Sequence, residues 1–400
     1  MNPGLRNGRA SRRTVITAGM AGLMAAATRP LRASPVLVVP EVDSLSLQVI
    51  VDSGTFGPFL PDLDLPGLKV QRAGNGGPPH MPRMLPRALL GEFGLSILGE
   101  SMRGGSRHRV LVDFGYSTEA MKNNLLLLGI DTSTIDAAVL SHGHLDHYGG
   151  FPALFGAVAK SRQNLPLVVG GEEAFCDRIA FVGKPPPIMG ALDRTALRRA
   201  GYDVRIRPEP VIIAEHAFTT GVIPLTSFER AAIPTQMRPG IGCNRALLDP
   251  SKRAALQIAD DGQHELATCY AVKGLGLVVI ASCSHRGVLN SVRRAQEVSG
   301  IDKVHAVIGG FHLVRPRTDE DALRTAAEFV KMDPTYLIPM HCTGEVFIAE
   351  AERLMPQKVI RSYVGSKFVF DAPGSAAASG SRLNRFDLPG NDLGRVTLIG

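Results

Sequence analysis

The chain has 400 residues, 44% of them hydrophobic and 20% charged, which is enough apolar surface for one large or two ordinary globular domains. Its formal net charge is +7, but residues 1–34 carry six arginines and no Lys, Asp or Glu, so the remainder is nearly neutral. The chain also lacks Trp. Both features argue against a nucleic-acid partner, because phosphate chains require a basic surface and single strands require aromatic stacking.

Residues 1–34 are predicted to be an export signal. Ser11–Ile16 reads SRRTVI, and the apolar stretch Val15–Ala27 is too short to span a bilayer. This pattern resembles a twin-arginine signal, which the export machinery recognises. We therefore expect the twin-arginine export machinery as a partner, a periplasmic or secreted location, and no stable membrane span after processing. A basic tail or an uncleaved anchor are the alternatives.

The predicted elements after the leader alternate between strands and helices. Gly54–Arg87 is rich in Pro and Gly without periodicity, which is typical of a lid, a binding loop or disorder. Residues 265–285 predict a hairpin that turns at Lys273-Gly274, and Thr318 is the expected N-cap of a helix. Strands are predicted in residues 45–53, 94–100, 108–113, 135–140, 166–170, 202–208, 303–309, 335–340 and 366–370. Helices are predicted in residues 117–130, 149–161, 172–179, 287–300 and 318–332.

This order of elements predicts an α+β fold made of two packed sheets with helices outside, a four-layer αββα sandwich. We expect this domain to cover residues 35–370. Residues 371–400 form a low-complexity C-terminal tail. The candidate site histidines all follow apolar strands, at sheet ends where loops gather.

The segment SHGHLDHYGG, residues 141–150, places three histidines and an aspartate within six positions. In an extended chain His142, His144 and Asp146 point the same way, while His147 points in the next direction. Gly143 lets the backbone bend between the first two imidazoles. The pattern predicts a dinuclear centre with ions about 3.5–4 Å apart. Zn²⁺ suits these ligands, and Mn or Fe are alternatives. The competing interpretation is a polar surface turn.

Five cysteines form no CxxC pair and no zinc-ribbon spacing. An oxidising compartment permits disulfides, but the odd number leaves at least one thiol free. Their pairing does not follow from the sequence, and Cys283 and Cys342 each lie close to a histidine.

Several motifs resemble the metallo-β-lactamase fold family. HGHLDH followed by Gly149-Gly150 resembles its signature, and the family's αββα architecture matches the predicted layers. The segments around it, together with ASCSHRGVLNSV, VIGGFHL and PMHCTG, resemble the branch identified as dihydropterin ribofuranosylaminobenzene-phosphate synthase. The resemblance covers approximately residues 45–370.

The resemblance implies two sets of metal ligands. The first set is His142, His144 and His285, and the second set is Asp146, His147 and His341. Both sets complete a centre of two divalent ions, in which Asp146 also helps to position the nucleophile. The common chemistry of such a centre is hydrolysis.

The resemblance also implies roles around the ions. Asp113 orients the histidine loop. Cys283 follows the strand where many relatives have a metal-bridging aspartate, so it is either a thiolate ligand or a small buried residue. His312 is a ligand, a substrate contact with a catalytic proton, or a structural group. The histidines outside these motifs are expected to be structural or exposed: His80, His108, His216, His264 and His305.

The main functional hypothesis is an exported hydrolase of a small ester, lactone or phosphoester. A transferase like the pterin branch and a non-catalytic metal-binding module are the alternatives. Where that branch has an acidic residue, an arginine and a histidine, this chain has Val222, Leu225 and Phe93. These departures concern the substrate and leave the metal ligands intact.

Overall fold

The computed structural model describes residues 37–55, 60–73, 87–155, 164–180 and 188–374, which belong to one compact unit beginning at Pro35. The predicted export signal and nearly all of the predicted C-terminal tail lie outside the described residues. Within the described ranges, every helix is too short or too polar to serve as a transmembrane span.

The first sheet has nine strands in the order β11-β8-β7-β6-β5-β2-β20-β4-β3 among the described residues. Strands β6, β7, β8 and β11 run parallel, and the other pairings are antiparallel. The strands are β2 (Ser44–Val51), β3 (Leu63–Leu65), β4 (Leu68–Gln71), β5 (Ser96–Arg103), β6 (Ser106–Val112), β7 (Ala137–Leu140), β8 (Leu165–Val169), β11 (Tyr202–Ile206) and β20 (Lys367–Asp371).

The second sheet has seven strands in the described part of the chain, and β17, β18 and β19 run parallel within it. Its strands are β1 (Glu41–Val42), β12 (Ile212–Ile213), β13 (Ala217–Thr219), β16 (Thr268–Val272), β17 (Gly276–Ala281), β18 (Val304–Gly309) and β19 (Tyr336–Pro339). The predicted hairpin at Lys273-Gly274 is confirmed as β16–β17. A small third sheet contains β9 (Asp177–Ala180), β10 (Ile188–Gly190), β14 (Thr235–Arg238) and β15 (Ile258–Ala259).

Three apolar clusters bind these sheets and their helices into four layers. Val139 and Ile308 belong to the cluster between the two large sheets. Met121 belongs to the cluster on the outer face of the first sheet, and Phe329 to that on the outer face of the second. The helices are α1 (Thr118–Leu127), α2 (Leu145–Tyr148), α3 (Arg194–Arg199), α4 (Val288–Ser299), α5 (Asp319–Met332) and α6 (Glu345–Leu354).

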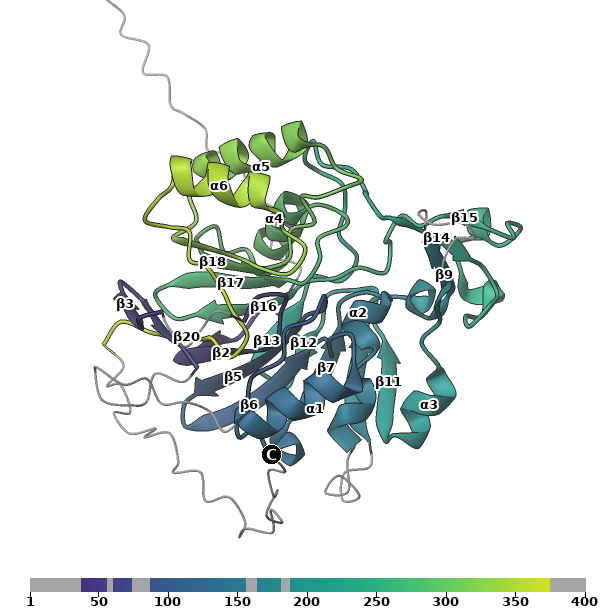
Figure 1. Cartoon of the computed structure of the whole chain (residues 1–400), viewed down its shortest axis with the longest axis horizontal. Helices are drawn as coiled ribbons and strands as arrows, with labels where there is room; N and C mark the ends of the chain where they lie inside the picture. Colours follow the sequence, from purple (N-terminus) through teal and green to yellow (C-terminus); the bar gives the residue numbers. More distant parts are fainter. Residues whose placement is uncertain (1–36, 56–59, 74–86, 156–163, 181–187, 375–400) are drawn as a thin grey trace, which may run out of the picture. The chain divides into compact units, whose positions relative to one another are not determined.

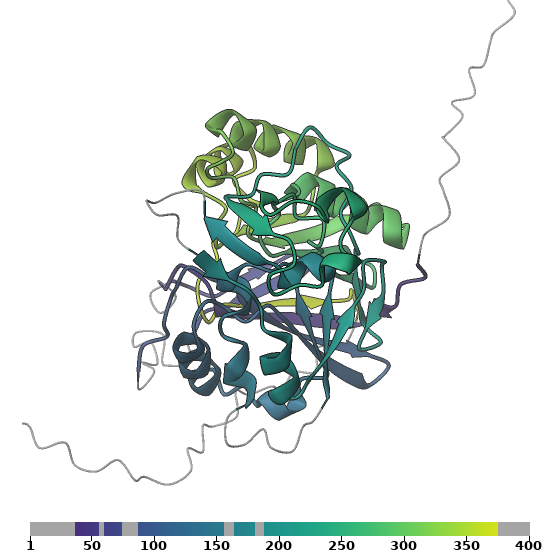
Figure 2. The same ribbon diagram turned by 90° about the vertical axis from the view of Figure 1, so that its right-hand side faces the viewer.

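Helices α4, α5 and α6 cover the second sheet, and α1 covers the first (Figure 1). Figure 2 shows the same order after a 90° turn, with strands between two groups of helices. The predicted αββα sandwich is therefore confirmed. Val139 and Leu140 illustrate its cause, because successive side chains of a strand face opposite layers.

Local signals fix the helix ends. Thr318 and Asp321 form a capping box at the start of α5, which confirms the predicted N-cap. Gly300 ends α4 with a left-handed backbone at φ 72°, which costs a glycine little.

Three expectations about secondary structure were wrong. The described part of the predicted helix 149–161 forms only a short 3₁₀ helix over Phe151–Phe155, and residues 156–161 lie outside the described residues. The stretch 54–87 contains the hairpin β3–β4, in which leucines and a valine alternate with polar residues and the chain turns at Pro66-Gly67. Its second strand, β4, pairs with the distant β20. The predicted helix 172–179 is a 3₁₀ turn over Glu172–Phe175 followed by β9. β9 pairs with β14 from another part of the chain, so tertiary pairing overrides the local pattern here.

Candidate metal centre

The candidate ligands lie in loops that leave the carboxyl ends of parallel strands in both large sheets. His142 and His144 follow β7 in the first sheet, and Asp146 and His147 lie in the short helix α2 directly after them. In the second sheet, the corresponding loops follow three neighbouring parallel strands and carry Cys283 and His285 after β17, His312 after β18, and His341 after β19. Packing the two sheets face to face brings these loops together at one edge.

The predicted second set forms a tight triangle of donor atoms. His147 Nε2 lies 3.2 Å from His341 Nε2, and both nitrogens lie 3.4 Å from Asp146 Oδ2. Ligands about 2.0–2.2 Å from a tetrahedral ion stand about 3.3–3.6 Å from one another. The three atoms therefore have the spacing of one face of a tetrahedral metal site.

The predicted first set forms a triangle of imidazole rings. The ring centroid of His142 lies 4.6 Å from that of His144 and 4.9 Å from that of His285, and the third separation is 4.7 Å. His144 Nε2 lies 3.2 Å from Thr235 Oγ1, which leaves its Nδ1 for an ion. The structure thus brings the three rings of the predicted first set together, as it does the donor atoms of the predicted second set.

Asp113 follows β6 and sets the tautomers of two of these histidines. Ser141 Oγ donates to Asp113 Oδ2 at 2.7 Å, so it accepts from the Nδ1 of His142 at 3.0 Å. His147 Nδ1 donates to the same Asp113 oxygen at 2.7 Å. With Nδ1 as the donor, the neutral form of each histidine carries its lone pair on Nε2, as metal ligation requires. Asp113 thus contacts the histidine loop at two points, directly at His147 and through Ser141 at His142.

His285 is oriented in the same way by a carbonyl group. Its Nδ1 donates to the Ala232 carbonyl oxygen at 3.1 Å, so its Nε2 also carries the lone pair. Burial lowers the pKa of His142 and His285 well below the usual value, and burial together with Arg178 lowers the pKa of His144 to about 3. These three imidazoles are neutral at physiological pH.

The second set carries more charge. Burial disfavours protonation of His147, but the carboxylates of Asp146 and Asp113 outweigh it and raise the pKa of His147 to about 9. His147 is fully buried and Asp146 nearly so. A cation held against Asp146 would replace the proton that this carboxylate otherwise attracts.

Cys283 lies at the centre of the candidate ligands. Its Sγ forms compact donor groups, with all atoms within 4.8 Å, with His142 and His285, with His147 and His341, and with His312 and Cys342. Its distances are 3.5 Å to His312 Nδ1 and 3.9 Å to His341 Nε2. A thiolate and an imidazole on one tetrahedral zinc ion would be about 3.5 Å apart, so the His341 distance lies within about half an ångström of that spacing.

Unpaired buried nitrogens also indicate that these residues can bind divalent cations. The Nε2 atoms of His142, His285 and His312 are buried and have no hydrogen-bond partner among the described residues. Leaving one buried polar atom unpaired costs about 1–3 kcal/mol, so three of them in one place indicate a partner other than protein. We call this group the histidine cluster; it comprises His142, His144, Asp146, His147, Cys283, His285, His312 and His341.

Two carboxylates that sequence reasoning missed hold the backbone of these loops. Asp52, directly after β2, accepts the backbone N–H of His341 at 2.9 Å. Glu265 accepts the backbone N–H groups of His285 and Arg286 at 2.8 and 2.7 Å. Asp52 could have been suspected, because it follows an apolar strand as Asp113 does. Glu265 precedes its strand, and the sequence carries no comparable signal for it.

A second buried group lies behind the loop between His142 and His144. His264 Nε2 accepts the backbone N–H of Gly143 at 3.0 Å, and Arg178 donates to the Gly143 carbonyl oxygen at 3.0 Å. Arg178 also pairs with Asp260 at 2.7 Å, and Asp260 lies 4.0 Å from His144 Nε2. With Glu173 and Lys252, which pair at 2.7 Å, these residues form what we call the ionic cluster: Glu173, Arg178, Lys252, Asp260 and His264.

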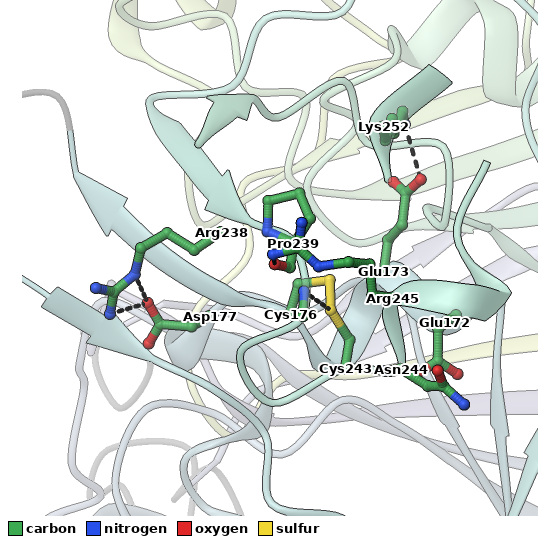
Figure 3. Close-up of a disulfide and its surroundings, with 12 residues drawn as sticks. Glu172, Glu173, Cys176, Asp177, Arg238, Pro239, Cys243, Asn244, Arg245 and Lys252 are labelled. Carbon is green, nitrogen blue, oxygen red and sulfur yellow. Dashed lines mark hydrogen bonds and ion pairs between the residues drawn. A yellow bond between two sulfur atoms is a disulfide. The ribbon is translucent and has the colours of Figure 1, made fainter. Parts of the chain in front are cut away.

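A disulfide joins Cys176 to Cys243 beside the ionic cluster, and it resolves part of the cysteine pairing that the sequence left open. Figure 3 shows the Glu173–Lys252 pair and the Asp177–Arg238 pair near the disulfide. The turn before Cys176 packs closely on the site, because a Cβ at Gly143 would lie 2.2 Å from the carbonyl oxygen of Ala174. Glycine is therefore required between the two histidines. The free cysteines are Cys269, Cys283 and Cys342.

Phe93 marks the solvent side of the histidine cluster. Its ring centroid lies 4.8 Å from that of His341, yet 59% of its surface is exposed. Leu225, the other exposed departure from the pterin branch, is 38% exposed. A cavity of about 320 Å³ lies elsewhere, beside the start of β7, and its lining includes His108 and Arg205 but no member of the histidine cluster.

The remaining histidines have contacts outside the histidine cluster. His216 Nδ1 lies 3.0 Å from Ser101 Oγ, and His305 Nε2 lies 3.0 Å from the Gly67 carbonyl oxygen. His108 lies 3.5 Å from Asp136. His80 is outside the described residues. His264 differs from these, because it supports the ligand loop directly.

Comparisons with known proteins agree with this fold. Residues 102–161, which include the HGHLDH loop, match the model of the metallo-beta-lactamase superfamily. The chain is similar to the crystal structure of a metal-dependent hydrolase of the beta-lactamase superfamily, at 22% identity and a TM-score of 0.57 over 81% of this chain and 98% of that one.

Two relatives come from Methanocaldococcus jannaschii. One is the 7,8-dihydropterin-6-methyl-4-(β-D-ribofuranosyl)-aminobenzene-5′-phosphate synthase, 29% identical over 282 residues that cover 68% of this chain and 90% of that protein. The other is an uncharacterized protein, 28% identical over 239 residues, or 59% of this chain and 79% of that protein. Residues 102–161 are thus similar to the metallo-β-lactamase superfamily, and the chain shares its fold with a solved structure of that superfamily.

Proposed function

We propose that the protein is a metal-dependent hydrolase that binds two divalent ions in the histidine cluster. The observation that carries this proposal is the triangle of Asp146 Oδ2, His147 Nε2 and His341 Nε2, with separations of 3.2–3.4 Å. Its neighbour is a triangle of neutral imidazoles that includes two unpaired Nε2 atoms. Zn²⁺ is the proposed ion, and Mn or Fe are alternatives with similar ligands.

Each residue of the cluster has a proposed role. His142, His144 and His285 would hold one ion, and Asp146, His147 and His341 would hold the other. Cys283 would supply a thiolate from its position next to both ligand sets. When bound, two divalent ions lower the pKa of a water and polarise the oxygen of a scissile ester or phosphoester.

His312 is the proposed proton donor to the leaving group. It is buried, its ring centroid lies 4.3 Å from that of His285, and its Nε2 has no partner among the described residues. Proton delivery by a positioned imidazole contributes typically about 10²–10⁴-fold to a rate. Its Nδ1 faces the Cys283 sulfur at 3.5 Å, which fixes the direction of the ring.

The proposed substrate is a small ester, lactone or phosphoester, which would reach the metal centre by passing the ring of Phe93. An aromatic ring next to His341 and open to solvent offers an apolar contact at the entrance to the centre. The near-neutral charge after residue 34 argues against nucleic acid as the substrate.

A transferase reaction is the second candidate, and the 29% identity to the pterin synthase supports it. That similarity covers 68% of this chain and 90% of the relative. Val222, Leu225 and Phe93 argue against the same substrate, because they replace polar residues with apolar ones where substrate would be held.

One screen separates these candidates. The wild type, His144→Ala and the control His108→Ala are assayed on p-nitrophenyl esters, phosphate mono- and diesters, lactones, and a pterin-transfer mixture. We expect hydrolysis by the wild type and by His108→Ala, and its loss in His144→Ala. Hydrolysis that persists in His144→Ala would exclude the histidine cluster as the active site, and transfer without hydrolysis would favour the synthase.

We also propose export by the twin-arginine machinery, supported by the Arg12-Arg13 pair and the apolar stretch after it. Cell fractionation of the wild type and of the double variant Arg12→Lys/Arg13→Lys tests this. The wild type is expected in the periplasm or medium and the variant inside the cell. The same distribution for both proteins would contradict export by this route.

A further inference from the structure

Two reduced sulfurs lie side by side in the histidine cluster. Cys283 Sγ and Cys342 Sγ are 3.1 Å apart, and each residue is 3% exposed. They follow β17 and β19, which flank β18 in the second sheet, so rigid strands fix both positions. Gly310, after β18, leaves room for this contact, because a Cβ there would lie 2.7 Å from Cys342 Sγ.

The separation is short for two ligands of one ion. Two thiolates at about 2.3 Å from a tetrahedral zinc ion stand about 3.8 Å apart. A disulfide bond is about 2.05 Å long, so closing this pair requires the sulfurs to approach by about 1 Å. The pair is therefore closer to the geometry of bond formation than a pair of thiolates that share one ion would be.

Bond formation and ion binding compete for the same sulfur. Cys283 Sγ belongs to the donor groups of both ligand sets, with His142 and His285 and with His147 and His341. A sulfur bonded to Cys342 is no longer a thiolate, so it cannot be shared with an ion. Oxidation would thus remove a ligand from the middle of the centre.

We propose that Cys283 and Cys342 are a redox-sensitive modification site, which closes to a disulfide when the ions are absent and withdraws the Cys283 sulfur from the centre. The proposal rests on the proposed function only in that ions bind in the histidine cluster. The Cys176–Cys243 disulfide lies outside the cluster and serves as an internal reference in the same chain.

The oxidant is a low-molecular-weight disulfide such as oxidised glutathione. One cysteine thiolate attacks a sulfur of the oxidant, forms a mixed disulfide and releases one small thiol. The second cysteine then displaces the other small thiol and forms the Cys283–Cys342 bond. Two cysteine thiols lose two electrons, one small disulfide gains them, and the two cysteine protons end on the released thiols.

The test uses the full chain in two states, metal-free after chelation and loaded with zinc. Both are treated with oxidised glutathione, alkylated under denaturing conditions without reduction, and analysed by peptide mass spectrometry. We expect a Cys283–Cys342 cross-link in the metal-free protein only, and the Cys176–Cys243 cross-link in both. The cross-linked protein should bind at least one zinc ion fewer per chain, and a thiol reductant should restore binding.

Two variants serve as matched controls. Cys342→Ser keeps the Cys283 sulfur but cannot form the bond, so its zinc binding should survive the oxidant. Cys269→Ser removes a free buried thiol outside the cluster and should behave as the wild type. No cross-link in the metal-free wild type, or a cross-link that leaves zinc binding unchanged, would overturn the proposal. Failure of the reduced wild type to bind zinc would instead overturn the proposed function.

Discussion

The histidine cluster and the ionic cluster are both buried and polar, and the ionic cluster contacts the histidine loop at Gly143. In the ionic cluster the charges pair within the protein, Arg178 with Asp260 and Lys252 with Glu173. In the histidine cluster the imidazoles of His142, His285 and His312 each keep a buried nitrogen without a partner among the described residues. Glu173 Oε2 and His264 Nδ1 of the ionic cluster also lack a hydrogen-bond partner among the described residues, but these two atoms lie 3.9 Å from each other. The two clusters therefore differ mainly in whether the protein itself supplies cationic side chains to the donors.

The ionic cluster illustrates the point, because Glu173, Asp260 and His264 also bring donor atoms within 4.8 Å of one another. Arg178 and Lys252 already supply the positive charge there, at 2.7 Å from the carboxylates. The cluster acts on the histidines through Gly143, whose N–H and carbonyl it holds. One cluster is suited to bind ions and the other to place the binding loop.

The largest effect is expected from His147→Ala in the histidine cluster. The variant loses one corner of the donor triangle, so it should lose the second ion. Hydrolysis should fall about a thousandfold, which corresponds to about 4 kcal/mol of transition-state stabilisation. Metal analysis and kcat/KM measure both effects. Full activity and full metal content in His147→Ala would contradict the assignment of this cluster as the metal centre.

Asp260→Asn should affect the ionic cluster in a different way. It leaves the Arg178 guanidinium buried without its countercharge, which should lower the free energy of unfolding by about 3 kcal/mol. Denaturant unfolding of the metal-free protein measures this loss, with Arg353→Ala on the surface as a control near zero. Equal stability of Asp260→Asn and wild type would show that the charge pair does not support the loop.

His264→Ala tests the link between the clusters. It removes the acceptor of the Gly143 N–H, so the loop that carries His142 and His144 should lose its fixed position. Zinc affinity should fall about tenfold, as for other groups that orient metal ligands. His264→Gln supplies another acceptor and should recover part of the affinity. Unchanged zinc affinity in His264→Ala would show that the ionic cluster does not position the loop of the histidine cluster.

Phe93→Ala should have the smallest effect, because the ring lies beside His341 without holding it by a hydrogen bond. Metal content should remain that of the wild type, while KM rises several-fold through the loss of about 1 kcal/mol of aromatic contact. A loss of zinc instead of a change in KM would mean that the ring supports the donor triangle.

Much of the histidine cluster follows from the sequence, because each loop comes directly after an apolar strand. His142, His144, Asp146 and His147 lie in one motif, and His285 and His341 follow strands of similar pattern. The strand ends bring them to one sheet edge once the αββα order is predicted. Only the structure shows that Cys283 is adjacent to both sets.

The ionic cluster could not be predicted, because its members come from four separate segments without a shared motif. Arg178 lies in a stretch with a helical pattern that forms β9, and Asp260 follows the two-residue strand β15. Pairing with β14 determines the strand structure of both segments. The hairpin β3–β4 was missed for a related reason, since its short strands depend on β20 far along the chain.

Zinc titration of the reduced, metal-free chain tests the central claim most directly. Calorimetry and metal analysis together should give two ions per chain for the wild type and fewer for His147→Ala, with the same secondary structure in both. Absence of bound zinc in the wild type, or an identical number of ions in the variant, would contradict a two-ion centre built on the histidine cluster.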